Sequence, residues 1–406
     1  MRRFALLVAA LACAAIPAQA GAAADPALVS KLARYMRAAG SQSGAYVVNL
    51  TDRQTAFRWR QSTPRILASN AKLFTTATAL ARFGTEGTLG TEVLGRGTAT
   101  VDGVWRGDLY LRGGGDPTFG SRSFTRSRYG AGSTVEDLAL GIQQAGIQRV
   151  TGRILGDESA FDPLRGGPDS GYAISRWVEP LSALSYNHGL GYGQNPPLSA
   201  AAGLDAALER RGITVRAAPR AGVAPPGSEV LASVDSPPMS DLVRMTNKPS
   251  DNFFAEMLLK GIARQANGRG TTSGGARIVV DFARELGAPA RLVDGSGLSR
   301  GNRATPRRIV RFLAGMTARD EFDAWYASLP VAGRDGTLAK RMRSGAARGR
   351  CNAKTGTLSN VSALSGFCEA RSGDLYAFSI LMNGVYPSGA RQLQDRMAHA
   401  LAALYD

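Results

Sequence analysis

The sequence predicts an α+β or mixed core that is interrupted by a separate inserted module. Three observations support this prediction. Hydrophobic residues make up 44% of the chain and charged residues 20%, which is typical of a folded globular protein. The length of 406 residues suggests two or three domains, at roughly 150 residues per domain. Strand and helix patterns near both ends flank a long middle stretch that is rich in Gly, Pro and short β-like runs.

Residues 1–20 have the pattern of an export signal. A cationic start at Arg2 and Arg3 precedes an apolar stretch over residues 4–16, and residues 18–20 fit the small-x-small cleavage pattern. We therefore expect cleavage after Ala20 and a mature protein that is exported across the cytoplasmic membrane. A buried N-terminal helix and a lipoprotein anchored through Cys13 are the alternatives. No later apolar run approaches the ~20 residues that a transmembrane helix needs.

Residues 21–86 and 239–406 are expected to form one domain, with residues 87–238 as an inserted domain. In the first part, two strands are predicted at residues 45–50 and 55–59, joined by a short turn. A helix is predicted from Ser69 to Gly84, because apolar residues recur at helical spacing between them.

The insert combines helix signals with short strand signals. Its predicted elements are helices at 135–145 and 201–211 and β-like runs at 108–112 and 153–156. After Met239 the chain is predicted to be helical, then to form three consecutive strands over residues 352–386. The last helix, at residues 390–405, carries its apolar residues on one face.

Cys351 and Cys368 are the two cysteines that remain after cleavage of the signal. An oxidising compartment allows such a pair to persist as a disulfide. A hairpin centred between Ser359 and Asn360 places the two residues directly opposite each other, within disulfide reach. The sequence therefore predicts a disulfide, with two free buried thiols as the alternative.

Charge and histidine content exclude several classes of function. The formal net charge is +17, but the arginines are scattered and no nucleic-acid motif occurs, so no nucleic-acid partner is predicted. An anionic cell envelope is one expected partner, and a basic composition without specific meaning is the alternative. The chain has two histidines and no HExxH motif, so a His-rich zinc site is excluded and no metal or cofactor is predicted.

The first motif is the Ser-x-x-Lys pair of Ser69 and Lys72. Their spacing places both side chains on one face at the start of the predicted helix. A serine hydroxyl is a weak nucleophile until a base removes its proton. Lysine can act as that base when burial and nearby cations lower its pKa. Taken alone, the pair is more often an N-cap serine followed by a surface lysine.

The second motif, Ser250-Asp251-Asn252, stands at the head of an apolar helix. The serine can relay a proton, and the asparagine can hold a substrate carbonyl or orient the lysine. A helix cap without any catalytic role is the alternative.

The third motif lies in a predicted strand and begins Lys354-Thr355-Gly356-Thr357-Leu358. A lysine and hydroxyl groups on the rim of a strand suit a substrate carboxylate. The glycine lets another backbone approach closely, as when a peptide substrate lies alongside like an added strand. The alternative is a strand whose polar residues face water.

The three motifs together, in this order and in an exported chain, resemble those of penicillin-binding proteins and class A β-lactamases. Further segments resemble the penicillin-binding-protein-4 type of D-alanyl-D-alanine carboxypeptidase/endopeptidase, of low-molecular-mass class C. These segments are residues 107–118, the run DGSGLSR at 294–300 and the run KTGTLSNVSALSG at 354–366. The resemblance covers most of the mature chain.

The resemblance implies a β-lactamase/DD-peptidase-like α+β fold, with an antiparallel sheet flanked by helices and a smaller inserted α/β module. It also implies a serine DD-peptidase that acts on peptidoglycan stem peptides and that β-lactam antibiotics inhibit covalently. One departure concerns the insert. Better-known members have a longer insert with two domains, whereas here we expect one full domain and a reduced remnant near residues 185–197.

The motifs carry the catalytic roles over to this sequence. The resemblance implies that Ser69 is the acylated nucleophile and that Lys72 is its base. Ser250 would relay a proton at the scissile nitrogen, and Asn252 would bind the amide of the substrate. Lys354 would stabilise the terminal carboxylate.

The remaining roles concern the substrate. Thr355 and Thr357 would hydrogen-bond the terminal carboxylate, and the backbone N–H groups of Ser69 and Thr357 would form the oxyanion hole. Arg300 is expected to line the pocket for a stem-peptide side chain, with Glu179 as a weaker candidate for the acidic partner there. Surface charge is the alternative for both residues.

Rival readings fit the sequence less well. Residues 297–301 match GxSxG, but residues 294–296 are predicted as a turn and His399 lies inside the last predicted helix, which does not suit an α/β-hydrolase. A class A β-lactamase would hold a deacylating water on a glutamate, and no convincing glutamate loop occurs at the expected place. A non-catalytic wall-binding protein would not need intact Ser69, Lys72 and Lys354.

Overall fold

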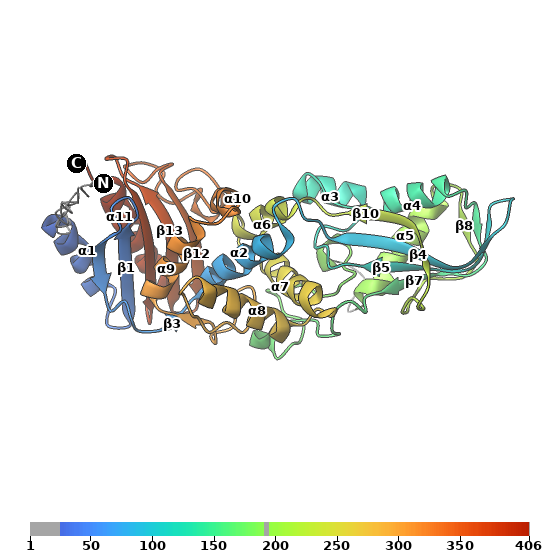
Figure 1. The fold of residues 1–406 in the computed structure, drawn as a ribbon, viewed down its shortest axis with the longest axis horizontal. Coiled ribbons are helices and arrows are strands. Elements are labelled where there is room, and N and C mark those ends of the chain that lie inside the picture. Colours follow the sequence, from blue (N-terminus) through green and yellow to red (C-terminus); the bar gives the residue numbers. More distant parts are fainter. Residues whose placement is uncertain (1–24, 191–194, 406) are drawn as a thin grey trace, which may run out of the picture.

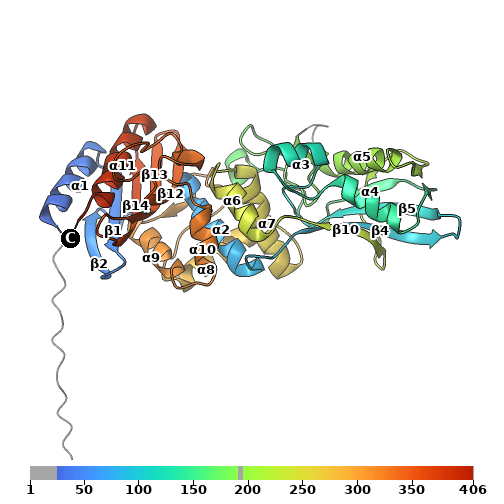
Figure 2. The same cartoon turned by 90° about the horizontal axis from the view of Figure 1, so that it is seen from above.

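The computed structural model describes residues 25–190 and 195–405, which form an elongated molecule with a large sheet at either end (Figure 1). The predicted export signal, residues 1–20, lies outside the described residues. A layer of helices separates the two sheets, and a view from above shows the same succession (Figure 2).

The first sheet has five antiparallel strands. Its order is β12 (Cys351–Leu358), β13 (Val361–Glu369), β14 (Leu375–Asn383), β1 (Ser43–Asn49) and β2 (Gln54–Trp59). The three consecutive C-terminal strands and the N-terminal pair confirm the prediction from sequence. The pairing of β1 with β14, in which Val47 lies opposite Phe378, joins the two halves of the chain into one sheet. Strand β12 forms one edge.

Helices cover both faces of this sheet. Helices α1 (Pro26–Ala38) and α11 (Pro387–Ala402) pack on one face through a shared apolar core. On the other face, α9 (Pro306–Met316) contacts β1 and β14. Because both faces are covered, β13 and β14 are buried over almost their whole length.

The central helical layer positions the predicted nucleophile. It contains α2 (Ala71–Phe83), α6 (Met239–Asn247), α7 (Asn252–Asn267), α8 (Thr272–Glu285) and α10 (Phe322–Ser328). The predicted helix at residues 69–84 is confirmed, with one refinement. Ser69 lies in a 3₁₀ turn, η1 (Ala68–Asn70), that leads into α2, and Gly84 ends the helix with a φ of 76°.

The second sheet belongs to the middle of the chain and has seven strands. Its main order is β10 (Glu229–Asp235), β4 (Gly90–Ala99), β5 (Val104–Gly113), β6 (Arg149–Val150) and β8 (Thr214–Val215). Strand β7 (Ile154–Asp157) also pairs with β5, and β9 (Arg220–Ala221) pairs with β7. The pairings of β5 with β6 and β7 are parallel, so this part is a mixed α/β module.

Helices α4 (Val135–Gln144) and α5 (Pro196–Glu209) cover one face of the second sheet. Trp105, Leu109 and Leu111 alternate along β5 toward them and are buried. The short helix α3 (Arg122–Tyr129) lies nearer to the central layer (Figure 1). Helix α5 begins earlier than expected, because Asn195 caps it and a proline occupies its first turn.

Residues 158–190 are largely irregular; they follow β7 and pack against the central helices. Phe161 and Leu181 from this segment join the apolar core of the central helices. The ammonium of Lys260, on α7, lies 2.7 Å from a carboxylate oxygen of Asp162 and is fully buried. The segment is therefore anchored to α7.

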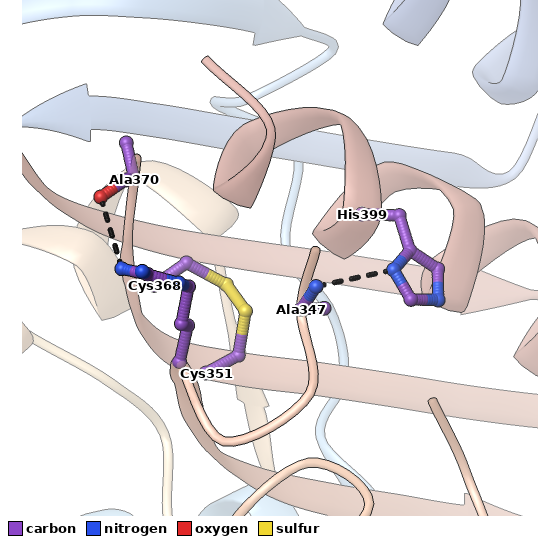
Figure 3. The surroundings of a disulfide bond; sticks show 6 residues. Ala347, Cys351, Cys368, Ala370 and His399 are labelled. Carbon is purple, nitrogen blue, oxygen red and sulfur yellow. Dashed lines mark hydrogen bonds between the residues drawn. A yellow bond between two sulfur atoms is a disulfide. The ribbon is translucent and has the colours of Figure 1, made fainter. Parts of the chain in front are cut away.

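Cys351 and Cys368 form the predicted disulfide. They lie directly opposite each other on β12 and β13, close to His399 on α11 (Figure 3). None of the helices in the part of the chain that the structure describes is long and apolar enough to cross a membrane.

Candidate active site

The ammonium or amine of Lys72 lies among three oxygen atoms. Its Nζ is 2.7 Å from Asn252 Oδ1, 2.7 Å from the carbonyl oxygen of Ser296 and 3.2 Å from Ser69 Oγ. A neutral amine has two N–H donors and one lone pair. The two carbonyl oxygens can take both N–H bonds, which leaves the lone pair for the hydroxyl of Ser69.

The environment of Lys72 favours this neutral form. The side chain is fully buried, and burial lowers the pKa of Lys72 to about 8. The negative charges of Asp251, Glu256 and Asp294 act in the opposite direction. Lys72 is therefore a base that is partly unprotonated near neutral pH.

The DGSGLSR run forms the turn that carries the Ser296 carbonyl. Glu256, buried on α7, accepts hydrogen bonds from the backbone N–H groups of Gly295 and Ser296, and Asp294 accepts one from Gly297. Burial raises the pKa of both Glu256 and Asp294, that of Asp294 to about 7.

Gly297 brings the same turn against the nucleophile. Its φ is 87°, and a Cβ added there would lie 2.0 Å from the carbonyl oxygen of Ala68. Only glycine fits this close approach of two backbones. The contact therefore gives a physical reason for the second glycine of the DGSGLSR run.

The second motif lies at the start of α7, and each of its three residues makes different contacts. Asp251 caps the helix by accepting a bond of 2.9 Å from Phe254 N, so the expected capping does occur. Asn252, in the first turn, accepts from Lys72 and donates to the carbonyl oxygen of Trp177 at 3.1 Å. Ser250 has a left-handed φ of 65°.

Strand β12 packs directly against the turn that carries Ser69. The amide of Asn70 donates to the carbonyl oxygen of Lys354 at 2.8 Å. A Cβ added at Gly356 would lie 2.9 Å from Leu67 O and 3.1 Å from Ser69 N. The strand and the nucleophile are therefore in backbone contact, although they are far apart in the sequence.

The side chain of Lys354 lies behind the surface of the site. It is fully buried and donates to the carbonyl oxygen of Thr355 at 3.1 Å. Burial, and to a smaller extent the charge of Lys72, lowers the pKa of Lys354 well below its ordinary value. Thr355 and Thr357, rather than Lys354, line the open space next to Ser69.

Two cavities meet at Ser69, Ser250 and Thr357. The larger has a volume of about 780 Å³ and is lined also by Asp169, Arg176, Trp177, Asn252, Leu298, Arg300, Leu358 and Ser359. The smaller has a volume of about 450 Å³ and is lined also by Thr337, Lys340, Arg341, Thr355, Gly356 and Arg391. The hydroxyl of Ser69 thus has room for a different part of a substrate on either side.

Arg300 and Glu179 differ in their positions. Arg300 lines the larger cavity and donates to the carbonyl oxygen of Ser359 at 3.0 Å. The structure does not place Glu179 there, because its carboxylate turns toward His188, 3.5 Å away. The acidic residue that lines the cavity is Asp169, in the short 3₁₀ turn η2 (Pro168–Ser170), which offers no spacing pattern from which to predict it.

The smaller cavity holds cationic residues that sequence reasoning also missed. Arg391, on α11, donates to the hydroxyl of Thr357 at 3.0 Å, and Lys340 and Arg341 also line this cavity. Thr337 shares a hydrogen bond of 2.7 Å with Thr355. Within residues 25–190 and 195–405, no group of three or more His, Cys, Asp or Glu is placed to hold a metal ion.

Comparisons with known proteins agree with this geometry. Residues 27–190 and 191–404 match the D-Ala-D-Ala carboxypeptidase 3 (S13) family. The chain is 31% identical to the D-alanyl-D-alanine carboxypeptidase of Actinomadura sp. (strain R39) over 454 residues, which cover 89% of this chain and 81% of that protein.

Two solved structures show that the fold is shared. Penicillin-binding protein 4 (dacB) from Haemophilus influenzae superimposes with a TM-score of 0.77 at 21% identity, over 90% of this chain and 97% of that one. The penicillin G-acylated Bd3459 predatory endopeptidase from Bdellovibrio bacteriovorus superimposes with a TM-score of 0.53 at 19% identity, over 88% and 90% of the two chains.

Proposed function

This chain belongs to the D-Ala-D-Ala carboxypeptidase 3 (S13) family, and from that premise we propose which of its residues carry out a serine-type peptidase reaction. The observation that supports the proposal most directly is the environment of Lys72. Two carbonyl oxygens occupy the N–H donors of the neutral amine and leave its lone pair for the hydroxyl of Ser69.

Acylation begins when Lys72 takes the proton of Ser69. The Ser69 oxygen attacks the carbonyl between two D-alanines, and the backbone N–H groups of Ser69 and Thr357 stabilise the resulting oxyanion. The tetrahedral intermediate collapses to an ester, and the leaving nitrogen receives a proton through Ser250. Water then hydrolyses the ester and regenerates the hydroxyl of Ser69.

The two cavities suit the two halves of the substrate. The smaller cavity, with Thr355, Thr357 and three cationic residues, suits the carboxylate of the leaving D-alanine. Lys354, which is buried on β12 behind the lining of this cavity, adds positive potential when it is protonated. The larger cavity suits the acyl part of the stem peptide, with Arg300 beside the side chain that precedes the D-alanines.

The same chemistry extends to cross-linked stem peptides. The leaving amine is then part of a second stem peptide, and the reaction is that of a DD-endopeptidase. The larger and smaller cavities share Ser69, Ser250 and Thr357 in their linings, which supports this wider substrate range.

β-Lactam antibiotics are proposed to acylate Ser69, and the resulting ester is proposed to be hydrolysed slowly. Fast deacylation would need a glutamate that holds a water molecule next to the ester. The described residues that line the two cavities include no glutamate, which supports inhibition over rapid hydrolysis. We further propose that the enzyme is exported through residues 1–20 and works on the cell wall outside the cytoplasmic membrane.

A covalent capture experiment tests this function. Labelled penicillin should attach to the wild type and to Ser359→Ala, a control in the same cavity, but not to Ser69→Ala. A Ser69→Ala variant that hydrolyses a D-Ala-D-Ala peptide at the normal rate would contradict the proposal.

A further inference from the structure

His188 is buried at the junction between residues 158–190 and α7, and the proposed reaction makes no use of it. Only 3% of the residue is exposed. Its ring packs against Phe253, with the ring centroids 4.5 Å apart, and against Phe254 at 5.8 Å. Polar groups approach both ring nitrogens, so the imidazole is more than an apolar filler.

The turn that holds His188 is in an unusual conformation. Asn187, His188 and Gly189 have φ values of 50°, 61° and 69°. Non-glycine residues adopt this left-handed conformation when their surroundings hold them there. The side-chain oxygen of Asn187 accepts from Ser121 N at 2.8 Å, which anchors the turn to the segment before α3.

The hydroxyl of Tyr129, the last residue of α3, lies 2.5 Å from Nδ1 of His188. Burial raises the pKa of Tyr129, so its hydroxyl keeps its proton and can donate it to Nδ1. A neutral imidazole with an accepting Nδ1 carries its own proton on Nε2. The N–H of His188 is therefore directed away from Tyr129.

Two carboxylates lie on the Nε2 side of the ring. Nε2 is 3.5 Å from Glu179 Oε2 and 3.7 Å from Asp251 Oδ2. The other oxygen of Asp251 accepts the capping bond from Phe254 N. Asp251 is thus fixed at the helix end through Oδ1, while its Oδ2 lies beside the edge of the imidazole, at a distance longer than a hydrogen bond.

Asp251 stands between the two residues of the motif that face the reaction. Ser250 precedes it in a left-handed conformation, and Asn252 follows it and accepts the bond from Lys72. A shift of the Asp251 side chain would therefore move the proton relay and the partner of the base together.

We propose that His188 is a positioning residue that holds Asp251, and through it Ser250 and Asn252, in the geometry that the acylation of Ser69 needs. The proposal rests on the assignment of Ser69 and Lys72 as nucleophile and base. It makes the turn at residues 187–189 a support for the catalytic loop, without any contact between His188 and the substrate.

The charged groups around the ring agree with this role. Glu179 and Asp251 face Nε2, Tyr129 faces Nδ1, and Arg128 acts on both Tyr129 and Glu179. Burial alone would raise the pKa of Glu179, but the hydrogen bond with His188, together with smaller lowering effects that include the charge of Arg128, outweighs burial and lowers that pKa. The imidazole is thus coupled to the carboxylate of Glu179, with Asp251 as its other charged neighbour on the same side.

Two replacements of His188 distinguish positioning from packing. His188→Gln keeps an N–H donor on the side of Glu179 and Asp251, whereas His188→Phe keeps the ring among Phe253 and Phe254 but has no donor. If His188 positions the loop, the rate constant for acylation by labelled penicillin falls roughly 10- to 100-fold in His188→Phe and much less in His188→Gln. The equilibrium constant for the initial complex stays nearly unchanged in both.

Controls separate this role from general effects. His399→Gln changes the only other histidine, on α11, and should acylate at the wild-type rate. Tyr129→Phe removes the hydroxyl that directs the imidazole without changing the ring packing, and should lose part of the acylation rate. This variant tests the proposal even if a His188 variant proves unstable in a thermal unfolding experiment.

The outcomes are distinct. Faster acylation in His188→Phe than in His188→Gln would show that the site needs only an aromatic filler and would overturn the proposal. Wild-type acylation in Tyr129→Phe would also count against it. Failure of the wild type to capture penicillin at all would instead refute the proposed function.

Discussion

Lys72 is the proposed base, and opposing influences act on its pKa. Burial disfavours the ammonium form, whereas Asp251, Glu256 and Asp294 favour it. The outcome is a pKa of about 8, between that of an exposed lysine and that of a lysine in a purely apolar site. A residue with this pKa can take a proton from Ser69 and later return it.

The rate of acylation should therefore depend on pH in a defined way. Only unprotonated Lys72 can accept the serine proton, so the rate rises with pH and levels off above about 8. Stopped-flow capture of labelled penicillin over roughly pH 6 to 10 measures this profile. A profile that is flat across this range would mean that Lys72 is not the base.

A second prediction concerns the carboxylate of Glu256. Its negative charge raises the pKa of Lys72, so Glu256→Gln should lower that pKa and move the rising limb of the profile to lower pH. The amide oxygen can still accept from the turn at residues 295–296, which preserves its geometry. Glu285→Gln, exposed on α8, is the control, and a limb that moves to higher pH would contradict the prediction.

At the residue scale, the sequence predicted those groups that a short motif carries. Ser69, Lys72, Ser250 and Asn252 meet as their motifs suggested. Asp169 could not be predicted, because a lone acidic residue in a single short turn has no periodicity or spacing that marks it. For the same reason the sequence did not indicate the cationic residues of the smaller cavity.

Strand β12 and turn η1 show how secondary-structure elements position the nucleophile. Asn70, on η1, donates to the backbone of β12 and accepts a bond of 2.7 Å from Ser365 on β13. Gly356 allows the strand to approach the backbone of Leu67 and Ser69. The nucleophile is thus fixed by an edge strand as well as by its own helix.

Gly356→Ala tests this contact. The added Cβ would lie 2.9 Å from Leu67 O, so the turn must shift, and a displacement of this kind can cost about 100-fold in the acylation rate. Gly389→Ala on α11 is the control, because a Cβ there meets no atom within 4 Å. Equal acylation rates in the two variants would show that the close approach does not matter.

At the element scale, strongly patterned segments were predicted well. The hairpin that pairs Cys351 with Cys368 was read correctly, as were the helix after Ser69 and the last helix. Helix α1 and strands β4 and β10 were not predicted. Strand β10 is half exposed and pairs only at the edge of its sheet, so its side chains lack the alternation that identifies a strand.

At the scale of the whole molecule, the stability of the fold depends on how the segment at residues 158–190 packs on α7. Its buried ion pair between Asp162 and Lys260 is joined by a bond of 3.0 Å from Lys260 to the carbonyl oxygen of Leu164. The sequence indicated an insert from its texture, but not which part of it would contact the central helices. That contact joins residues distant in the chain, and no local pattern encodes it.

Lys260→Met should destabilise the protein by about 3–5 kcal/mol, because it leaves Asp162 without its partner in a largely buried place. The double variant with Asp162→Leu should recover much of this loss, since no unpaired charge remains. Arg284→Met, which breaks the exposed pair with Asp281, should cost no more than about 1 kcal/mol. Denaturant unfolding measures all three, and equal losses in the two single variants would contradict the argument.

The larger cavity takes Asp169, Arg176 and Trp177 from the segment at residues 158–190, whereas the reacting groups come from elsewhere in the chain. The residues proposed to select the substrate and those proposed to react with it therefore come from different stretches of the chain. A chimaera that exchanges this segment with that of a relative would be expected to change which peptides are preferred while the acylation chemistry stays the same. In such a family, substrate preference can change while the residues proposed to react stay the same.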